Sequence, residues 1–165
     1  MLDDPALNET TTQVSGKLAH AWAFLSGETR AFGSVTNAPA PPHTRGCFLL
    51  PLDVAQDDKH CAIVVLIPPD DAQQVASNMF GLDPSQLVEA DLADACAETC
   101  NLFSDCIVMH LSGEADVSIG LPSLLDEDAY AQACRQSHIA AQYGSPSASR
   151  CLSVLVLDPY CPPPH

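Results

Sequence analysis

The sequence predicts an α+β protein, in which helices pack over a mostly antiparallel sheet of about five or six strands. Stretches with apolar residues at helical spacing are interspersed with shorter β-rich runs, which are typical of strands. Residues 61–67 form a continuously apolar run, so we expect a strand that is buried on both faces. The polar residues 56–59 separate this run from another β-rich run, which is a pattern typical of a hairpin.

Length and composition indicate a single domain over residues 1–158, followed by a flexible tail over residues 159–165. With 47% hydrophobic residues, the chain of 165 residues can bury a substantial core. The net charge of −15 disfavours nucleic acid and membranes as partners and suits a partner that presents lysines or arginines. We expect a cytoplasmic protein, because the first residues are acidic and no apolar segment is long enough to span a membrane.

Two helices are expected in the first half of the chain. Residues 8–25 place apolar side chains at helical spacing, and Gly27 closes this helix. A second helix begins at Pro69 and ends at Gly81. Its apolar residues repeat at helical spacing and are expected in the core: Ala72, Val75, Ala76, Met79 and Phe80.

The sheet is expected to form from β-rich segments on both sides of the longest helix. These segments cover residues 30–36, 45–54, 60–67, 114–120, 135–143 and 150–157. A proline-containing loop at 37–43 and a Gly-Ser-Pro-Ser turn at 144–147 separate neighbouring strands. A short helix is expected at 126–133, before the last two strands.

The longest helix is predicted over residues 87–111, because no glycine or proline interrupts this segment. Residues 83–86 supply a start signal, with a capping carboxylate and a proline at the first helical position. At about 100° per residue the side chains separate onto two faces. The apolar face carries Leu92, Ala93, Cys96, Ala97, Cys100, Phe103 and Ile107. The opposite face, within roughly 80°, is an acidic ridge made of Asp91, Asp94, Glu98, Asn101 and Asp105.

An acidic ridge is most often just the solvated face of a helix. Two features of this one favour a site. Asp94, Glu98 and Asn101 have the spacing D-x3-E-x2-N, and Pro122 follows 21 positions after Asn101, behind a strand-like run. Asparagine is also unfavourable inside a helix, because its side chain competes for backbone hydrogen bonds. Some function should therefore account for Asn101.

The residue types of the ridge limit its chemistry. A carboxamide beside a carboxylate is not a nucleophile–base pair, and the thiols of this helix point to its opposite face. Carboxylates along a straight helix form a line rather than a cage for a hard cation. An asparagine can, however, donate and accept hydrogen bonds at once, and so can hold a water in line with a phosphorus atom. Glutamine orients the attacking water of GTPases in this way.

The chain resembles the CheC/CheX/FliY phosphatases of bacterial chemotaxis, and CheX most of all. Their motif matches Asp94, Glu98 and Asn101 here, followed by Pro122 in the segment Gly-Leu-Pro-Ser, and the similarity extends upstream through residues 75–81. There is one copy of the motif, as in CheX-like proteins. The family usually has a glycine a few residues after the asparagine, whereas this chain has the small residue Ser104 at that distance.

The resemblance implies a CheX/CheC-like fold and a hydrolase of two-component signalling that dephosphorylates the aspartyl-phosphate of a CheY-type response regulator. Asn101 would orient the attacking water, and Glu98 would pair with the lysine beside the phosphoaspartate. Asp94, Asp91 and Asp105 would contact the partner. The Mg²⁺ ion would be carried by the regulator, so the chain would need no cofactor of its own, and it would form a homodimer through its sheets.

Two other interpretations remain open. The same helix could dock on a receiver domain without hydrolysing its phosphoryl group, which would make the chain a binding module. Alternatively the chain could be a dimeric scaffold whose acidic ridge is simply solvated.

The chain has 8 cysteines, and we expect them to be buried, reduced thiols. No C-x-x-C motif occurs. Cys96 and Cys100 lie one helical turn apart, but a zinc site would need two further ligands that the spacing does not supply. No metal site is therefore predicted. His110, at the end of the long helix, is interpreted as structural.

Overall fold

The structure is a computed structural model that describes residues 5–36, 46–55, 59–111, 116–145 and 152–162. The predicted turn at 56–59 and loop at 37–43 lie wholly or mostly outside these ranges. The helices are α1 (Pro5–Ser26), α2 (Pro69–Phe80), the short 3-10 helix η1 (Pro84–Gln86), α3 (Glu89–Leu111) and α4 (Glu127–Gln136). The strands are β1 (Gly33–Ser34), β2 (Cys47–Val54), β3 (Lys59–Leu66), β4 (Val117–Ile119), β5 (Ser123–Leu124), β6 (Ile139–Ser145) and β7 (Leu152–Leu157).

The strands form one antiparallel sheet in the order β1-β6-β7-β3-β2-β4, with β5 also paired to β2. The predicted α+β class with an antiparallel sheet is confirmed. The described part contains 7 strands rather than five or six, because β5 was not expected. β5 is only 2 residues long and has no residue pattern that would distinguish it from a loop.

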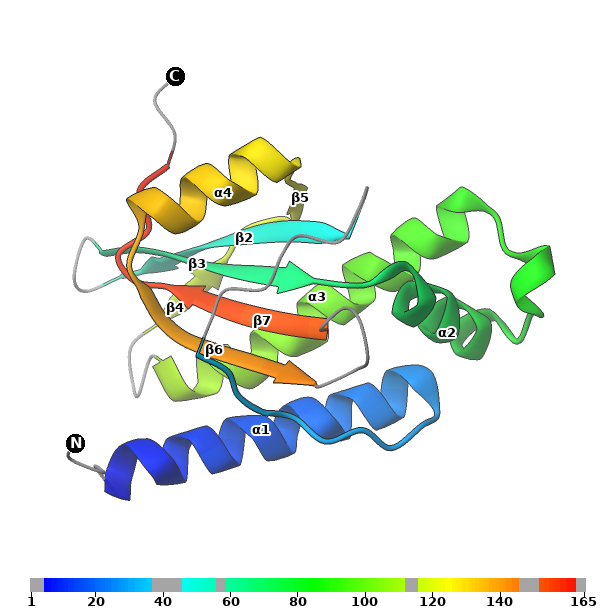
Figure 1. Ribbon diagram of the computed structural model, residues 1–165, viewed down its shortest axis with the longest axis horizontal. Helices are drawn as coiled ribbons and strands as arrows, with labels where there is room; N and C mark the ends of the chain where they lie inside the picture. The colour runs from blue at the N-terminus through cyan, green and yellow to red at the C-terminus, as the bar shows by residue number, and fades with distance from the viewer. Residues whose placement is uncertain (1–4, 37–45, 56–58, 112–115, 146–151, 163–165) are drawn as a thin grey trace.

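Helices α1, α2 and α3 cover one face of the sheet, and α4 covers the other (Figure 1). Alternate residues of β3 serve the two layers: Ile63 and Val65 pack with α1, α2 and α3, whereas Ala62 and Val64 pack with α4. All residues of the run 61–67 are buried, as predicted. This double burial explains why the strand shows no polar alternation.

Several helix boundaries differ from the predicted ones. α4 continues to Gln136, so the strand expected from residue 135 begins only at Ile139. Residues 83–86 do form a capping box, but it starts the separate helix η1, and α3 begins at Glu89. At this second start the Val88 N–H donates to the Asp91 carboxylate at 3.0 Å. The chain therefore uses two capping signals where one was inferred.

The core assignment of α2 is only partly correct. Ala72, Val75 and Ala76 are buried as predicted, but Met79 and Phe80 are exposed. They lie in the last turn of the helix, which extends beyond the end of the sheet (Figure 1). Gly81 then ends the helix in the left-handed conformation, at φ 64°, as predicted for a C-terminal glycine.

A buried ion pair joins the segment after α1 to α2. Arg30 Nη2 lies 2.8 Å from Asp71 Oδ1, and the guanidinium group stacks 4.6 Å from the centre of the Trp22 ring. Nearby, the Asn78 side chain of α2 donates to the carbonyl oxygen of Leu25 at 2.9 Å. These contacts fix α1 and α2 relative to each other.

At the C-terminal end, the described residues of the segment expected as a tail make contacts with the domain. The Tyr160 N–H donates to the His60 carbonyl oxygen at 2.8 Å, and its ring packs against the α4 side of the sheet. Within the described residues, the helices are all too short or too polar to cross a membrane.

Candidate active site

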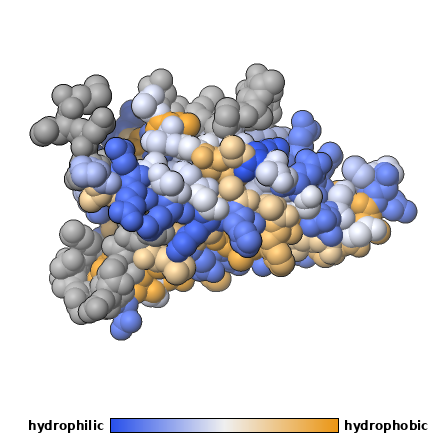
Figure 2. Space-filling model, turned by 90° about the horizontal axis from the view of Figure 1, so that it is seen from below, coloured by the Kyte–Doolittle hydropathy of each residue, from blue (hydrophilic) through white to orange (hydrophobic). Residues whose placement is uncertain are grey.

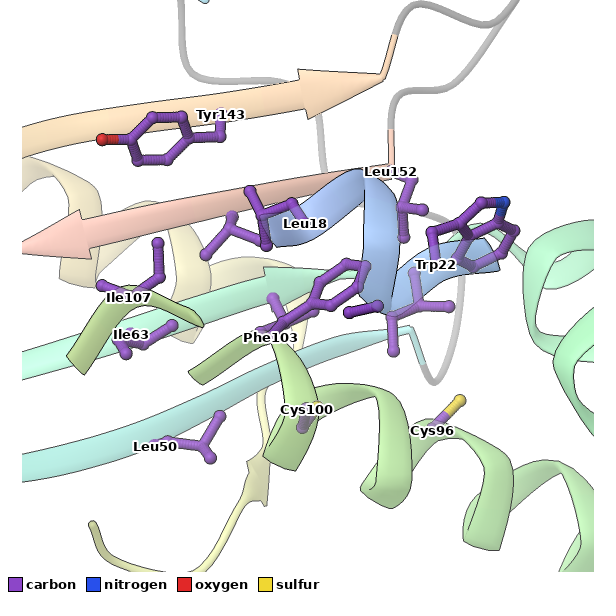
Figure 3. Close-up of a cluster of buried hydrophobic side chains, with 14 of the residues drawn as sticks. Leu18, Trp22, Leu50, Ile63, Cys96, Cys100, Phe103, Ile107, Tyr143 and Leu152 are labelled. Carbon is purple, nitrogen blue, oxygen red and sulfur yellow. The ribbon is translucent and has the colours of Figure 1, made fainter. Parts of the chain in front are cut away.

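Helix α3 is anchored by one face in the core. Cys96, Cys100, Phe103 and Ile107 follow one another along this face and are buried against the sheet and α1 (Figure 3). The ring of Phe103 meets that of Phe32 edge-on, with centroids 5.8 Å apart. A helix fixed in this way cannot turn about its axis, so its opposite face has a defined direction.

The structure brings the predicted ridge residues together on that opposite face. Asp94, Asn101 and Asp105 are exposed, and Glu98 is half-buried. At a rise of about 1.5 Å per residue the row from Asp94 to Asp105 extends for about 16 Å. Within the part of the chain that the structure describes, the side chains of Glu98 and Asn101 have no hydrogen-bond or ion-pair partner. Both groups are therefore free to meet another molecule.

Asp91 differs from the other ridge residues because it has a partner inside the chain. Its carboxylate accepts the hydrogen bond from the Val88 N–H at the start of α3, and its side chain is half-buried. A carboxylate in the first turn also suits the positive end of the helix dipole. The structure thus gives Asp91 a capping role in addition to the contact role that the sequence suggested.

The proline of the motif lies in a segment that is held against the sheet. Pro122 is half-buried between β4 and β5. The Gly120 N–H donates to the Pro51 carbonyl oxygen at 2.8 Å, and the Ser123 hydroxyl donates to the Leu49 carbonyl oxygen at 3.3 Å. An added Cβ at Gly120 would lie 2.6 Å from Pro51 Cγ, so only glycine allows this close approach to β2.

Cys96 and Cys100 of α3 lie on the buried face, away from the ridge, and are protonated at neutral pH. Burial raises the pKa of Cys96 to about 11 and raises that of Cys100 further. Burial likewise raises the pKa of Cys47, on β2, to about 12. Thiols of this kind are poor nucleophiles and poor metal ligands. Among the described residues, no group of three or more His, Cys, Asp or Glu side chains converges on a common point.

Ser104, which stands where a glycine was expected from the resemblance, is fully buried. Its hydroxyl has no hydrogen-bond partner among the described residues. The side chain faces the interior rather than the ridge, so the absence of glycine leaves the exposed surface around Asn101 unchanged.

One surface feature next to the ridge escaped the sequence analysis. An open groove runs between α1 and α3, and its walls include Gly16 on one side and Leu102 and Asp105 on the other. A glycine inside a predicted helix was the available signal, since glycine is unfavourable there without a reason. The partner helix across the groove could not be inferred from the pattern of either segment alone.

Comparisons with known proteins agree with this architecture at the level of the fold. No family model matches the sequence, and no curated protein is significantly similar to it. Among solved structures, chemotaxis protein CheX from Vibrio vulnificus shares 14% identity at a TM-score of 0.61, covering 91% of this chain and 99% of that one. A CheC-like superfamily protein from Shewanella sp. PV-4 shares 10% identity at a TM-score of 0.57, covering 91% and 97%.

A third similar structure is the CheX–CheY–BeF3–Mg²⁺ complex from Borrelia burgdorferi. It shares 12% identity with this chain at a TM-score of 0.55, covering 93% of this chain and 96% of that one. Coverage is thus nearly complete on both sides in all three comparisons. The chain has the fold of the CheC/CheX/FliY chemotaxis proteins, as the sequence motif suggested.

Proposed function

We propose that this protein is a phosphatase that hydrolyses the aspartyl-phosphate of a CheY-type response regulator. The observation that carries the proposal is the placement of Glu98 and Asn101. They lie one turn apart on the outer face of a helix whose inner face is locked in the core, and both side chains lack partners in the described chain. The helix can therefore enter the active site of another protein without rearranging itself.

In the proposed reaction, Asn101 holds a water molecule in line with the phosphorus atom. Its carbonyl oxygen accepts a hydrogen bond from the water while the amide nitrogen donates to the phosphoryl group. Attack by the water breaks the bond between phosphorus and the carboxylate oxygen. The products are a free aspartate carboxylate, inorganic phosphate and a proton. The gain comes mainly from positioning, since an acyl phosphate is already reactive.

Glu98 serves in the proposed complex as the docking group. Its carboxylate pairs with the lysine that lies beside the phosphoaspartate of the regulator. Asp94 and Asp105 extend the negative surface on both sides, and the net charge of −15 favours approach of a basic partner. The regulator brings its own Mg²⁺, so the phosphatase contributes no metal ligand.

The assembly and location that go with this function are also proposals. A regulator of this type acts in the cytoplasm, where the phosphatase would meet it. The sheet ends in short edge strands, β1 on one side and β4 with β5 on the other. Leu121 and Leu124 lie exposed along the second edge, which makes this edge suited to pairing with a second copy.

The decisive experiment measures phosphate release and complex formation separately, against a panel of phosphorylated receiver domains. Asn101→Ala should lower hydrolysis by about a hundredfold, and leave binding of the phosphorylated receiver within about twofold. Glu98→Ala should weaken binding as well as turnover, by about 1–3 kcal/mol. Asn8→Ala, which removes an exposed asparagine from α1, is the matched control and should change neither quantity.

The outcomes separate the two candidate functions. A double variant of Glu98 and Asn101 that hydrolyses as fast as the wild type would refute the proposed mechanism. A wild type that binds a receiver but releases no phosphate would instead identify a binding module. Neither substitution should alter the unfolding midpoint, because neither side chain has a partner in the described chain that the substitution would remove. Asn101 is exposed and Glu98 is half-buried.

A further inference from the structure

The groove between α1 and α3 is an apolar hollow beside the ridge. It has a volume of about 600 Å³. Its lining residues are Thr12, Gln13, Gly16, Lys17, His20 and Phe24 with others from both helices. Figure 2, seen from the side of α1, shows apolar side chains gathered in a band along the molecule, with hydrophilic ones beside them. Asp105 belongs to both the groove and the ridge, and Leu102 directly follows Asn101. The two surfaces are therefore continuous.

Gly16 is the first sign that the groove takes an occupant. It lies in the middle of the 22-residue helix α1, where glycine is the least favourable residue after proline. Packing within the described chain does not require it, because a Cβ added at this position would meet nothing within 4 Å. The glycine instead lets another molecule approach the backbone of α1 closely.

The apolar character of the groove is the second sign. Phe24, on α1, is 74% exposed, and Met109, on α3, is 66% exposed. Leu102 and Cys106 also line the groove and are half-buried. Large apolar side chains that remain in water along one groove are typical of a protein-binding surface.

Charge decides between possible occupants. Lys17 is the one Lys or Arg among the described residues that line the groove. It is directed across the groove, with its Nζ 3.6 Å from the sulfur of Met109. The side of the groove that adjoins α3 is bordered by Asp105 and then by Glu98 and Asp94. A second copy of this acidic chain would bring like charges together here. A partner segment with an apolar centre and lysine or arginine at its edge is complementary to the surface.

We infer that the groove between α1 and α3 binds an apolar surface segment of the phosphorylated receiver, flanked by a basic side chain that pairs with Asp105. This inference rests on the proposed function and extends it, because it assigns a second contact surface to the same partner. Binding in the groove sets affinity and orientation, whereas Glu98 and Asn101 act at the phosphoryl group. Gly16 is thus a residue that determines which partner fits.

The test fills the groove and leaves the ridge intact. Gly16→Trp places a bulky side chain in the groove. Gln136→Trp places the same side chain at an exposed position of α4, across the sheet from the groove, and is the matched control. The receiver, labelled and activated with beryllofluoride, is titrated with each variant, and phosphate release is measured over a range of receiver concentrations. Gly16→Trp should raise Kd and KM by about tenfold or more, with kcat unchanged, while Gln136→Trp should behave as the wild type.

A charge-reversal pair tests the basic contact. Asp105→Lys should weaken binding by about tenfold, whereas Asp128→Lys, the same change on α4 across the sheet, should have a much smaller effect. Unchanged affinity in both Gly16→Trp and Asp105→Lys would overturn the groove assignment while leaving the proposed hydrolysis in place. If Gly16→Trp and Asp105→Lys weaken binding as expected but Asn101→Ala hydrolyses as fast as the wild type, the groove assignment is supported and the proposed role of Asn101 is refuted. A wild type that binds no receiver would refute both.

Discussion

Removal of the Asp71 carboxylate should destabilise the fold more than most single substitutions. Asp71 and Arg30 lie 2.8 Å apart, and their side chains are only 8% and 23% exposed. A second guanidinium nitrogen, Nη1, is buried without a hydrogen-bond partner among the described residues, so no other group can compensate. Leaving one charge of a buried pair alone costs about 3–5 kcal/mol. Because Arg30 keeps some contact with water, the loss in the free energy of unfolding caused by Asp71→Ala should lie near the lower limit of this range, at about 3 kcal/mol.

A double-mutant cycle gives this prediction its sharpest form. Arg30→Met alone should also cost about 3 kcal/mol, since it leaves the carboxylate buried and unpaired. The double variant with Asp71→Leu should cost less than either single change, because no charge then remains inside. Urea unfolding can be followed through the fluorescence of Trp22, the single tryptophan, on which Arg30 stacks at 4.6 Å. Additive costs, about 6 kcal/mol in the double variant, would refute the reasoning.

Two further predictions concern pH and assembly. Burial raises the pKa of Cys47 to about 12 and that of Cys96 to about 11, from 9.0. These thiols therefore lose their protons at a lower pH in the unfolded chain than in the folded one. Stability should therefore be constant below about pH 8 and fall by about 1.4 kcal/mol for each of these thiols by pH 10. The Cys47→Ala/Cys96→Ala variant should lose about 3 kcal/mol of this dependence and keep the part due to Cys100, whose pKa burial also raises. Leu121→Glu, at a side chain that is 88% exposed, should convert the proposed dimer into a monomer in sedimentation at tens of micromolar, an order-of-magnitude choice, while the single subunit stays folded. A dimer that persists in this variant would exclude this edge of the sheet.

The elements that could be predicted are those whose signal is local and repeated. The apolar run 61–67 and the uninterrupted segment that forms α3 each contain enough residues for the period of the structure to show. β1 and β5 contain 2 residues each, and no period can be read from so short a segment. The end of α4 at Gln136 was missed because its last turn has no glycine or proline to mark it.

The residues of the candidate site could also be predicted from the sequence, because their signal is local. The ridge lies on one helix, so the positions of Glu98 and Asn101 on a common face follow from helical geometry alone. The Arg30–Asp71 pair joins residues 41 positions apart, and local patterns do not say which buried charges will meet. The groove likewise needs both α1 and α3, and neither helix reveals it separately.

The proposed chemistry explains why the site can lie on an exposed helix rather than in a pocket. A pocket excludes water and gathers catalytic groups, but here the phosphoryl group, the lysine and the Mg²⁺ ion would all belong to the regulator. In the proposed role this chain needs to add only one carboxamide at a defined place, and the accuracy of that placement depends on how firmly α3 is held. The burial of Cys100 and Phe103 behind Asn101 provides that support. The exposed ridge and the buried face of α3 therefore depend on each other. An exposed side chain can be placed accurately in a second protein only if the backbone that carries it is held rigid.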